Sequence, residues 1–440
     1  MPSATVEHFS LDVVFDPESL ETVEESPVAY VTKAFYRGDT SLRPVAIKSA
    51  STNPHFSKKP HDIAKELKIL TKLSHDNIIN VLGHGYEQAT SSLHFWMPFI
   101  TYKLRDLLDS PFFSPHSLFG RARQEQDVLS FLVLARSLTY QIVHGVKFLH
   151  EQRVAHRDIK PGNALIDGGG TLKLIDFGIA WADPRVCDNA GDLWPEPPEE
   201  MCFDVATGPY RAPELLFGAS SYDPYASDLW SLGTTCAEFF TPLRLQNRYD
   251  DYDELEDDLD EDDRKRPFVI PKSLTVSDPD GEWRRVSLFD ASRGSIGLAW
   301  SIFKTRGTPT ATTWPDFGLL PDASKVSFQV APKQNLQLLL PNVPASSSTV
   351  HTDRPAESNC VNLVEKFLSY QPSMRMSAAD ALRHPWFTEA APLVVPPRYT
   401  AASDDVQIEE TWESQTLADH LIAILHPPPA PEYNREERID

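Results

Sequence analysis

Cysteine is scarce in this sequence. The 440 residues include four cysteines, Cys187, Cys202, Cys236 and Cys360. No two of them have the spacing of paired metal ligands, and four cysteines in a chain of this length do not make a disulfide framework. The sequence therefore argues against a cysteine-based metal site and against a disulfide-stabilised secreted module. Reduced cysteines are typical of an intracellular protein, in the cytoplasm or the nucleus.

Positive charge is also in short supply. The chain has 41 Lys and Arg against 63 Asp and Glu, which gives a formal net charge of -22 at pH 7. Nucleic acids and anionic lipids attract basic surfaces, so we expect neither a nucleic-acid partner nor a membrane partner. Much of the excess negative charge lies in residues 250–263, which are nearly all Asp and Glu. Such a run repels itself and stays solvated, so the rest of the chain is less acidic than the total suggests.

Long apolar runs are absent as well. No apolar stretch in the sequence is long enough to span a bilayer. Residues 1–21 lack the basic and apolar regions of a signal peptide, so none is expected. The 41% of hydrophobic residues can nevertheless build a substantial core. The length suits one large two-lobed domain with insertions, or two ordinary domains.

The most informative stretch is His-Arg-Asp-Ile-Lys-Pro-Gly-Asn, at residues 156–163. Asp158 can orient a hydroxyl group and accept its proton. Lys160 can offset the charge of a phosphoryl group in transfer, and Asn163 can hold a cation. This set of side chains suits the transfer of a phosphoryl group from a metal-bound nucleotide to an alcohol.

A second motif, Asp176-Phe177-Gly178, follows the next hydrophobic run. A carboxylate at this place can hold Mg²⁺, which prefers oxygen ligands. Alone, Asp-Phe-Gly is commonly a turn, and His-Arg-Asp is commonly a surface salt-bridge cluster. Together, at this spacing, the two motifs resemble the catalytic loop and metal motif of the protein kinases.

The resemblance implies an α+β fold with two lobes: a small antiparallel sheet with one main helix, and a larger, mainly helical lobe. Sequence patterns agree with it. Strand-like alternation covers residues 28–49, 78–86 and 93–100, a helical stripe covers 61–74, and a long helix is expected at 129–151. We predict the following units: a lead-in at 1–20, a kinase domain at 21–388 with an N-lobe at about 21–99 and a C-lobe at about 100–388, an acidic insertion at 246–266, a polar loop at 343–358, and a Pro-rich extension at 389–440.

Lys48, in Val-Ala-Ile-Lys, resembles the strand lysine that reaches the nucleotide phosphates, and Glu66 is its expected partner. Taken singly, Lys48 would more often be an exposed strand lysine. The resemblance also implies an adenine site whose apolar residues would otherwise be assigned to the core. Its expected members are Val31 and Ala46 above the base, Leu165 below it, Met97 at the back, the carbonyl of Pro98 and the amide of Ile100.

The sequence departs from the kinase pattern at the phosphate-covering loop. Counting back from Val31 places Glu24, Ser26 and Ala29 where glycines are expected. Glycines let the backbone approach phosphates closely, and the carboxylates of Glu24 and Glu25 would repel them. Two unit charges about 4 Å apart interact by roughly 1 kcal/mol in water and about 4 kcal/mol at an intermediate dielectric. We therefore expect weaker nucleotide binding, with catalysis retained.

The second departure lies in the activation segment, where Cys202 stands about where many kinases have a phosphorylatable residue. Glu199, Glu200 or Asp204 could pair with Arg157 permanently and replace the phosphate charge. The alternative is that these acids are simply solvated.

Further motifs narrow the resemblance. Thr207 begins Thr-Gly-Pro-Tyr-Arg-Ala-Pro-Glu, in which Glu214 is expected to pair with Arg375. Arg211, together with Gly-Thr-Pro at 307–309, resembles the group that contains cyclin-dependent and mitogen-activated kinases, the CMGC group.

Within this group the chain resembles the fungal single-subunit kinases that activate cyclin-dependent kinases. The signs are the missing glycines, Phe-Asp-Val-Ala-Thr-Gly at 203–208, Ala-Glu-Phe-Phe-Thr-Pro at 237–242, the acidic run after it, and the absence of the cyclin-binding Pro-Ser-Thr-Ala-Ile-Arg-Glu sequence near Glu66.

The resemblance implies a monomeric serine/threonine kinase that uses ATP and Mg²⁺, with a cyclin-dependent kinase as its protein substrate and no obligatory cyclin. Asp158 and Lys160 would be catalytic, and Asn163 and Asp176 would hold the metal. Three alternatives stay open: a cyclin-dependent kinase proper, a weakly active or non-catalytic scaffold without the glycine-rich loop, and a binding role for the acidic run.

Overall fold

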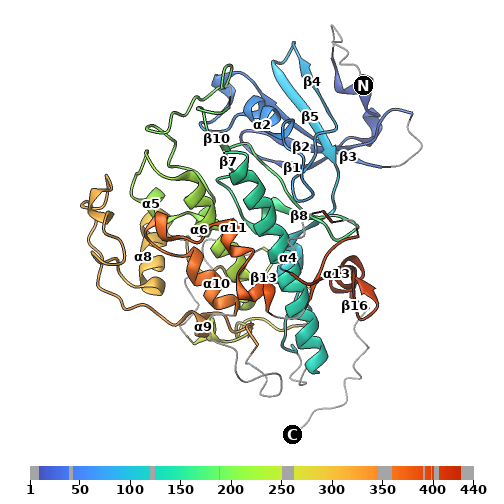
Figure 1. The fold of residues 1–440 in the computed structure, drawn as a ribbon. Helices are drawn as coiled ribbons and strands as arrows, with labels where there is room; N and C mark the ends of the chain where they lie inside the picture. Colours follow the sequence, from blue (N-terminus) through green and yellow to red (C-terminus); the bar gives the residue numbers. More distant parts are fainter. Residues whose placement is uncertain are drawn as a thin grey trace.

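The computed structural model describes residues 9–38, 43–118, 124–187, 189–249, 262–344, 359–389, 392–397, 399–400 and 406–427. A sheet-rich N-terminal lobe sits on a larger helical lobe, as Figure 1 shows. This is the expected bilobal α+β arrangement. The core of the acidic run (250–261) and the polar loop (345–358) lie outside the described residues.

The N-terminal lobe is built on one five-stranded antiparallel sheet with the order β1-β2-β3-β5-β4. Its strands are β1 (Glu21–Glu25), β2 (Tyr30–Ala34), β3 (Val45–Ser51), β4 (Gly83–Glu87) and β5 (Ser92–Pro98). Helix α2 (Ile63–Leu70) buries the side chains of Ile63, Leu67 and Leu70, the stripe that the sequence predicts. Asp62 caps this helix by accepting the amides of Ala64 and Lys65, each at 3.0 Å.

The lead-in residues that the structure describes pack on this sheet. They form the short helices α1 (Leu11–Val14) and η1 (Pro17–Ser19). Phe15 is fully buried and pairs with Tyr36 through a β-bridge, and its ring meets Trp96 edge-on at 5.2 Å. The lead-in therefore belongs to the folded N-terminal lobe.

One predicted strand is placed wrongly. Residues 78–86 were expected to be extended together, but the strand is β4, Gly83–Glu87. Ile78 forms a parallel bridge with Leu174 of the other lobe, and Ile79 donates its amide to the Leu174 carbonyl at 3.1 Å. Both isoleucines are buried in the contact between the lobes, which the apolar pattern alone cannot distinguish from strand burial.

The C-terminal lobe surrounds helix α4 (Glu125–Glu151), as Figure 1 shows. By length and composition α4 could cross a membrane, yet 72% of its apolar window is buried inside the protein. Its buried Arg136 donates to the carbonyls of Trp386 and Phe387, at 2.8 and 3.1 Å. Helix α4 is therefore the core helix of this lobe.

The other helices of the lobe are α3 (Leu104–Leu108), α5 (Pro213–Leu216), α6 (Pro224–Glu238), α8 (Gly294–Arg306), α9 (Leu336–Leu339), α10 (Cys360–Phe367), α11 (Ala378–Ala381) and α12 (Pro385–Thr388). Short 3-10 turns are η3 (Pro161–Asn163), η4 (Gly208–Tyr210), η6 (Asp263–Lys265), η7 (Phe317–Leu319) and η9 (Pro372–Met374), with η2 (Pro54–Phe56) in the N-terminal lobe.

Small sheets complete the lobe and carry its loops. Strands β6 (Tyr102–Lys103), β8 (Ala164–Ile166) and β9 (Leu172–Leu174) form one sheet, and β7 (Val154–Ala155) pairs with β10 (Trp181–Ala182). Strands β11 (Leu243–Asn247), β12 (Phe268–Val269) and β13 (Gly281–Arg285) form another, which flanks the acidic run on both sides in sequence.

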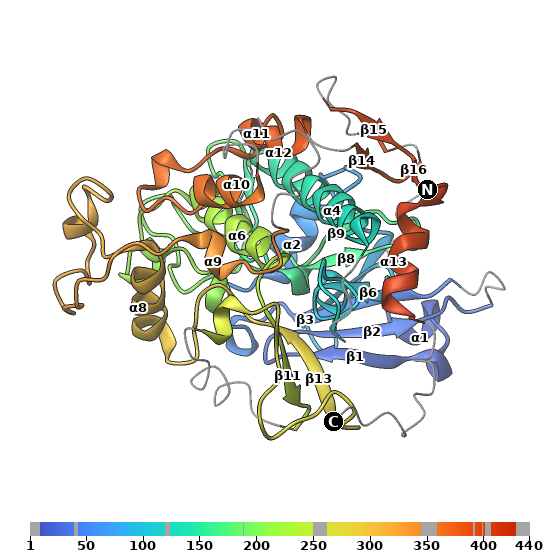
Figure 2. The same cartoon turned by 90° about the horizontal axis from the view of Figure 1, so that it is seen from below.

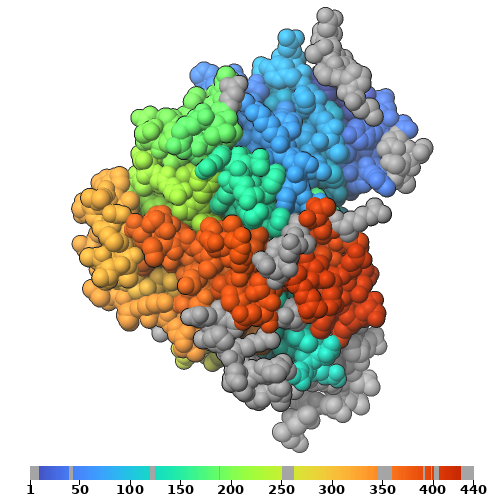
Figure 3. All heavy atoms as spheres, viewed as in Figure 1, coloured from blue at the N-terminus to red at the C-terminus, as the bar shows by residue number. Residues whose placement is uncertain are grey.

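The described part of the C-terminal extension packs on the helical lobe. It contains β14 (Leu393–Val394), β15 (Ile408–Glu409), the pair β16 (Thr411–Trp412) and β17 (Gln415–Thr416), and α13 (Leu417–Leu425). Leu393 and Val394 are fully buried. Figure 2 shows α13 beside β6, and Figure 3 shows the extension covering one face of the molecule below the N-terminal lobe. These residues are therefore part of the folded unit.

Leu417→Ala tests this role of α13. Leu417 is 1% exposed and packs on the backbone of Gly170, so the substitution should lower the free energy of unfolding by about 2–5 kcal/mol. Ile422→Ala on the same helix is the control, because Ile422 is 45% exposed and its truncation should cost less than about 0.5 kcal/mol. Urea denaturation of both variants measures the difference, and equal effects would contradict the packing described here.

Candidate active site

The catalytic loop is held from behind by Asp228 of α6. This fully buried carboxylate accepts the amide of His156 at 2.8 Å and the amide of Arg157 at 2.7 Å. The His156 ring contacts the Ile175 carbonyl at 2.9 Å, which ties the loop to the strand before Asp176. Arg157 has a φ of +64°, a conformation that costs a non-glycine residue energy and persists only where the surroundings enforce it.

Asp158 lies at the centre of three other residues that the sequence assigns to the site or to the activation segment. Its Oδ2 is 2.8 Å from Lys160 Nζ and accepts from Asn163 Nδ2 at 2.8 Å. Its Oδ1 accepts the hydroxyl of Thr207 at 2.7 Å, and Thr207 in turn accepts from Lys160 at 2.7 Å. The carboxylate is therefore fixed in orientation, as a group that must accept a proton from an incoming alcohol requires.

Lys48 joins the two lobes at the site. Its Nζ lies 2.7 Å from Glu66 Oε2 of α2 and 2.6 Å from Asp176 Oδ1. Glu66 also accepts the amide of Phe177 at 3.0 Å. The sequence pairs Lys48 with Glu66 correctly, and the structure adds Asp176 as a second partner.

The charged side chains in this group shift one another's pKa values. Burial alone would lower the pKa of Lys48, but the carboxylates of Asp176 and Glu66 raise it above its usual range. Burial alone would raise the pKa of Asp176, yet Lys48 holds it well below its usual range. Asp176 is therefore ionised at neutral pH, the form in which a carboxylate binds a cation.

Asp176 and Asn163 fit a magnesium site. The Asp176 side chain is 42% exposed, and the Asn163 amide nitrogen donates to the Asp158 carbonyl and carboxylate, which leaves its amide oxygen as the group for a cation. Among the described residues no group of three or more His, Cys, Asp or Glu could hold a metal. Two oxygen ligands completed by water and phosphate suit Mg²⁺, whereas a closed zinc site would need more protein ligands.

The expected adenine residues lie on adjacent strands. Ala46 of β3 is paired with Met97 of β5, Val45 with Pro98, and Val31 of β2 with Lys48. From the other lobe, Leu165 of β8 is paired with Lys103.

The connection between the lobes begins at Pro98. The Phe99 amide donates to the Pro44 carbonyl at 3.2 Å. The role of the Ile100 amide as a donor to the base stays a prediction.

The β1–β2 hairpin replaces the glycine loop with a tight turn. The Ser26 amide and hydroxyl both donate to the Ala29 carbonyl at 2.9 Å. Glu24, which is expected from the sequence to repel phosphate, lies 3.1 Å from Lys103 of the other lobe. Its charge is therefore partly offset, and the expected repulsion is reduced.

The activation segment differs from the sequence prediction. Arg157 pairs with Glu196, at 2.6 and 2.9 Å, and not with Glu199, Glu200 or Asp204. Glu199 and Glu200 are exposed. The prediction failed because it counted back from Thr207, whereas the segment folds so that a more distant residue reaches the arginine.

Asp204 lies 3.5 Å from Arg211, which also donates to the Phe203 carbonyl at 3.1 Å. Glu214 and Arg375 form a two-pronged ion pair, with both N–O distances 2.7 Å and both side chains buried. Arg375 is the partner that the sequence predicts for Glu214.

Sequence reasoning missed the supporting groups Asp228 and Glu196. Asp228 is a buried carboxylate near the start of an apolar helix, which could have indicated a partner in the core. Glu196 stands between prolines, in Pro-Glu-Pro-Pro at 195–198, a pattern that fixes the backbone around an acid.

The protein kinase domain family matches residues 28–387, most of the chain. The chain belongs to the protein kinase family. It is 27% identical over 387 residues to the serine/threonine-protein kinase ppk23 of Schizosaccharomyces pombe, covering 88% of this chain and 76% of that protein. It is 28% identical over 348 residues to cyclin-dependent kinase 11 of Dictyostelium discoideum, covering 78% and 73%.

A solved structure described as the yeast RNA Pol II CTD kinase CTDK-1 complex matches with a TM-score of 0.58 and 20% identity, covering 90% of this chain and 99% of that one. This likeness supports the bilobal fold. With the family match and the two relatives, this kinase is a serine/threonine kinase of the cyclin-dependent-kinase type.

The residues of this kinase supply the positioning and charge for phosphoryl transfer. ATP with Mg²⁺, which the family uses, brings the phosphoryl group. Lys48 is placed to hold the nucleotide phosphates, Asp158 to orient the acceptor hydroxyl and take its proton, and Lys160 to offset the charge that develops between them. Thr207 holds the side chains of Asp158 and Lys160 in their relative positions through its two hydrogen bonds.

Lys48→Met removes the cation that Glu66 and Asp176 share. We expect kcat/KM for ATP to fall by about 10²–10³-fold, as for the loss of one preorganised charge at a reacting phosphate. Lys72→Met is the matched control, because Lys72 is exposed just after α2 and should leave activity within about twofold. Steady-state assays of both variants with varied ATP decide the point.

Thr207→Val removes the hydroxyl that links Asp158 and Lys160. We expect kcat to fall by about 10–100-fold through misplacement of Asp158, with little change in KM for ATP. Thr207→Ser keeps the hydroxyl and should retain most of the activity. A serine variant as poor as the valine variant would show that the methyl group, and not the hydroxyl, matters.

Proposed function

We propose that this kinase phosphorylates the activation-segment threonine of a cyclin-dependent kinase, and that it works as a single chain without an obligatory cyclin. The observation that carries the single-chain part is the Lys48–Glu66–Asp176 group, which residues of one chain hold together at 2.6–2.7 Å. A kinase that needed a second protein to bring α2 inward would lack this contact when alone.

The choice of acceptor rests on the resemblance to the fungal single-subunit activating kinases, at residues 203–208 and 237–242 and at the acidic run. The kinase would use ATP with Mg²⁺ held by Asn163 and Asp176. We place it inside the cell, in the cytoplasm or nucleus, where its free cysteines would stay reduced.

A cyclin-dependent kinase proper is the second candidate, because one relative of 28% identity carries that name. The scaffold alternative is less favoured. Its motive was the absence of glycines, but the groups expected to act on phosphate and hydroxyl are assembled around Asp158 and Lys48.

The test is a transfer assay with purified kinase, Mg²⁺ and labelled ATP. The acceptors are a monomeric cyclin-dependent kinase and its variant with valine in place of the activation-segment threonine. We expect label only on the threonine-containing acceptor, and none with the Asp158→Asn variant of this kinase. Label on both acceptors would refute the proposed substrate, while the enzyme would remain a kinase.

Adding a cyclin to the assay distinguishes the proposed single-chain kinase from a cyclin-dependent kinase proper. If transfer to a generic peptide appears only when a cyclin is bound to this kinase, the chain is a cyclin-dependent kinase proper. If the Asp158→Asn variant keeps the full transfer rate, the label does not come from this site. That result would favour the non-catalytic scaffold alternative.

A further inference from the structure

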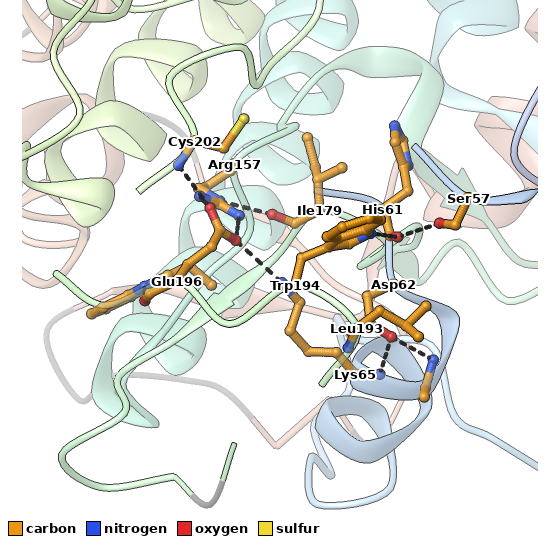
Figure 4. Close-up of polar contacts among 12 residues, drawn as sticks. Ser57, His61, Asp62, Lys65, Arg157, Ile179, Leu193, Trp194, Glu196 and Cys202 are labelled. Atoms are coloured by element: carbon orange, nitrogen blue, oxygen red, sulfur yellow. Dashed lines mark hydrogen bonds and ion pairs between the residues drawn. The ribbon is translucent and has the colours of Figure 1, made fainter. Parts of the chain in front are cut away.

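Glu196 of the activation segment bridges the two lobes. Its carboxylate receives two hydrogen bonds from Arg157, at 2.6 and 2.9 Å, and lies 3.3 Å from Lys65 Nζ. Figure 4 shows Glu196 between these two cations. All three side chains are buried, and Arg157 is fully so. Two positive charges from different lobes thus converge on one carboxylate.

The backbone around Glu196 is fixed. Pro195 and Pro197 flank it and restrict its conformations before folding. Its carbonyl accepts the indole N–H of Trp181 at 3.0 Å, and its Oε1 accepts the amide of Cys202 at 2.8 Å. The carboxylate is therefore preorganised and is not a mobile surface acid.

The residues just before Glu196 hold the start of α2. The Leu193 amide donates to Asp62 Oδ2 at 2.6 Å, and the Trp194 indole donates to the His61 carbonyl at 3.1 Å. Figure 4 shows both contacts beside Lys65. The activation segment thus docks on the helix that carries Glu66.

Both cations that Glu196 binds are next to groups of the active site. Arg157 precedes Asp158, and Lys65 precedes Glu66, the partner of Lys48. An unpaired buried cation at either place would displace its neighbour or draw in water, since buried charges need partners.

The part of the activation segment that surrounds Glu196 offers no hydroxyl group for phosphorylation. Residues 176–206 contain no serine, threonine or tyrosine. The next hydroxyl, on Thr207, is engaged by Asp158 and Lys160. Burial would raise the pKa of Glu196, but Arg157 and Lys65 lower it, so the carboxylate carries its charge at neutral pH.

We propose that Glu196 is a positioning residue that takes the place of a phosphate: its carboxylate aligns Arg157 with the catalytic loop and Lys65 with α2. The kinase is then competent as synthesised, without phosphorylation of its activation segment. This inference rests on the proposed function only in that the chain is an active kinase, and it does not depend on the identity of the acceptor.

The first experiment compares Glu196→Gln with Glu200→Gln. Both remove one negative charge from the same segment, but Glu200 is exposed. With a generic protein acceptor we expect Glu196→Gln to lower kcat by about 10–100-fold and to raise KM for ATP, while Glu200→Gln stays within about twofold of wild type. Wild-type kinase treated with phosphatase should keep its activity. Normal rates for Glu196→Gln, or inactivation of wild type by phosphatase, would overturn the proposal.

Chemical rescue separates positioning from simple support of the fold. Glu196→Ala leaves room for a small carboxylate, so added formate or acetate should restore part of kcat, whereas chloride at equal ionic strength should not. Absence of rescue in a variant whose thermal unfolding midpoint matches that of wild type would count against a role for the charge.

A second variant covers the case in which Glu196→Gln does not fold. Lys65→Gln/Glu196→Gln removes one cation with the carboxylate, so the buried cluster of Arg157, Lys65 and Glu196 keeps its net charge of +1. We expect this variant to fold and to remain at least about tenfold slower than wild type. Wild-type rates in it would overturn the inference.

Hydrogen exchange provides a readout that needs no catalysis. The comparison uses Glu196→Gln, or the double variant Lys65→Gln/Glu196→Gln if the single variant does not fold. Backbone amides of α2 and of residues 157–160 should exchange faster in that variant than in Glu200→Gln. If wild type transfers no phosphate at all, the proposed function fails, and this exchange result still decides whether Glu196 positions the two elements. Equal protection of these amides from exchange in both variants would reject the positioning role of Glu196.

Discussion

The shared position of the Lys48 ammonium between Glu66 and Asp176 constrains the rest of the site. Strand β3, helix α2 and the chain after β9 are separate in sequence, and this one cation fixes their relative placement. Removing one partner of a buried ion pair typically costs about 3–5 kcal/mol, because the remaining charge is left without solvation. Gly178 lies beside the group: a Cβ atom there would be 3.3–3.5 Å from all three charged side chains.

A second buried charge group also contacts the first turn of α2, through Lys65. Asp228 orients the backbone of Arg157, and Glu196 neutralises its side chain. Lys65 brings α2 to the same carboxylate. Two ion clusters therefore hold the first turn of α2, one through Lys48 and one through the activation segment. Because each cluster contains residues of both lobes, the relative placement of the lobes and the geometry of the site are coupled.

The hairpin without glycine shows how the chain accommodates a departure from the family pattern. Ser26 closes the turn with its own amide and hydroxyl, and Pro27 restricts its backbone. Glu24 reaches across to Lys103 of the helical lobe. A defined turn and an ion pair between the lobes thus stand where the family pattern has flexible glycines.

The sequence by itself determined the local features: the family motifs, the catalytic group of Asp158, Lys160 and Asn163, the Lys48–Glu66 pair and the long core helix. These features depend on short spacings and on helical or strand periodicity, and both can be recognised from residues that are close together in the sequence. The tertiary structure decided which residues far apart in the chain meet. It placed Ile78 between the lobes, the extension on the helical lobe, and Glu196 instead of Glu199, Glu200 or Asp204 against Arg157. The physical reason is that a buried charge takes whichever opposite charge the folded backbone brings within reach, and sequence distance says little about that.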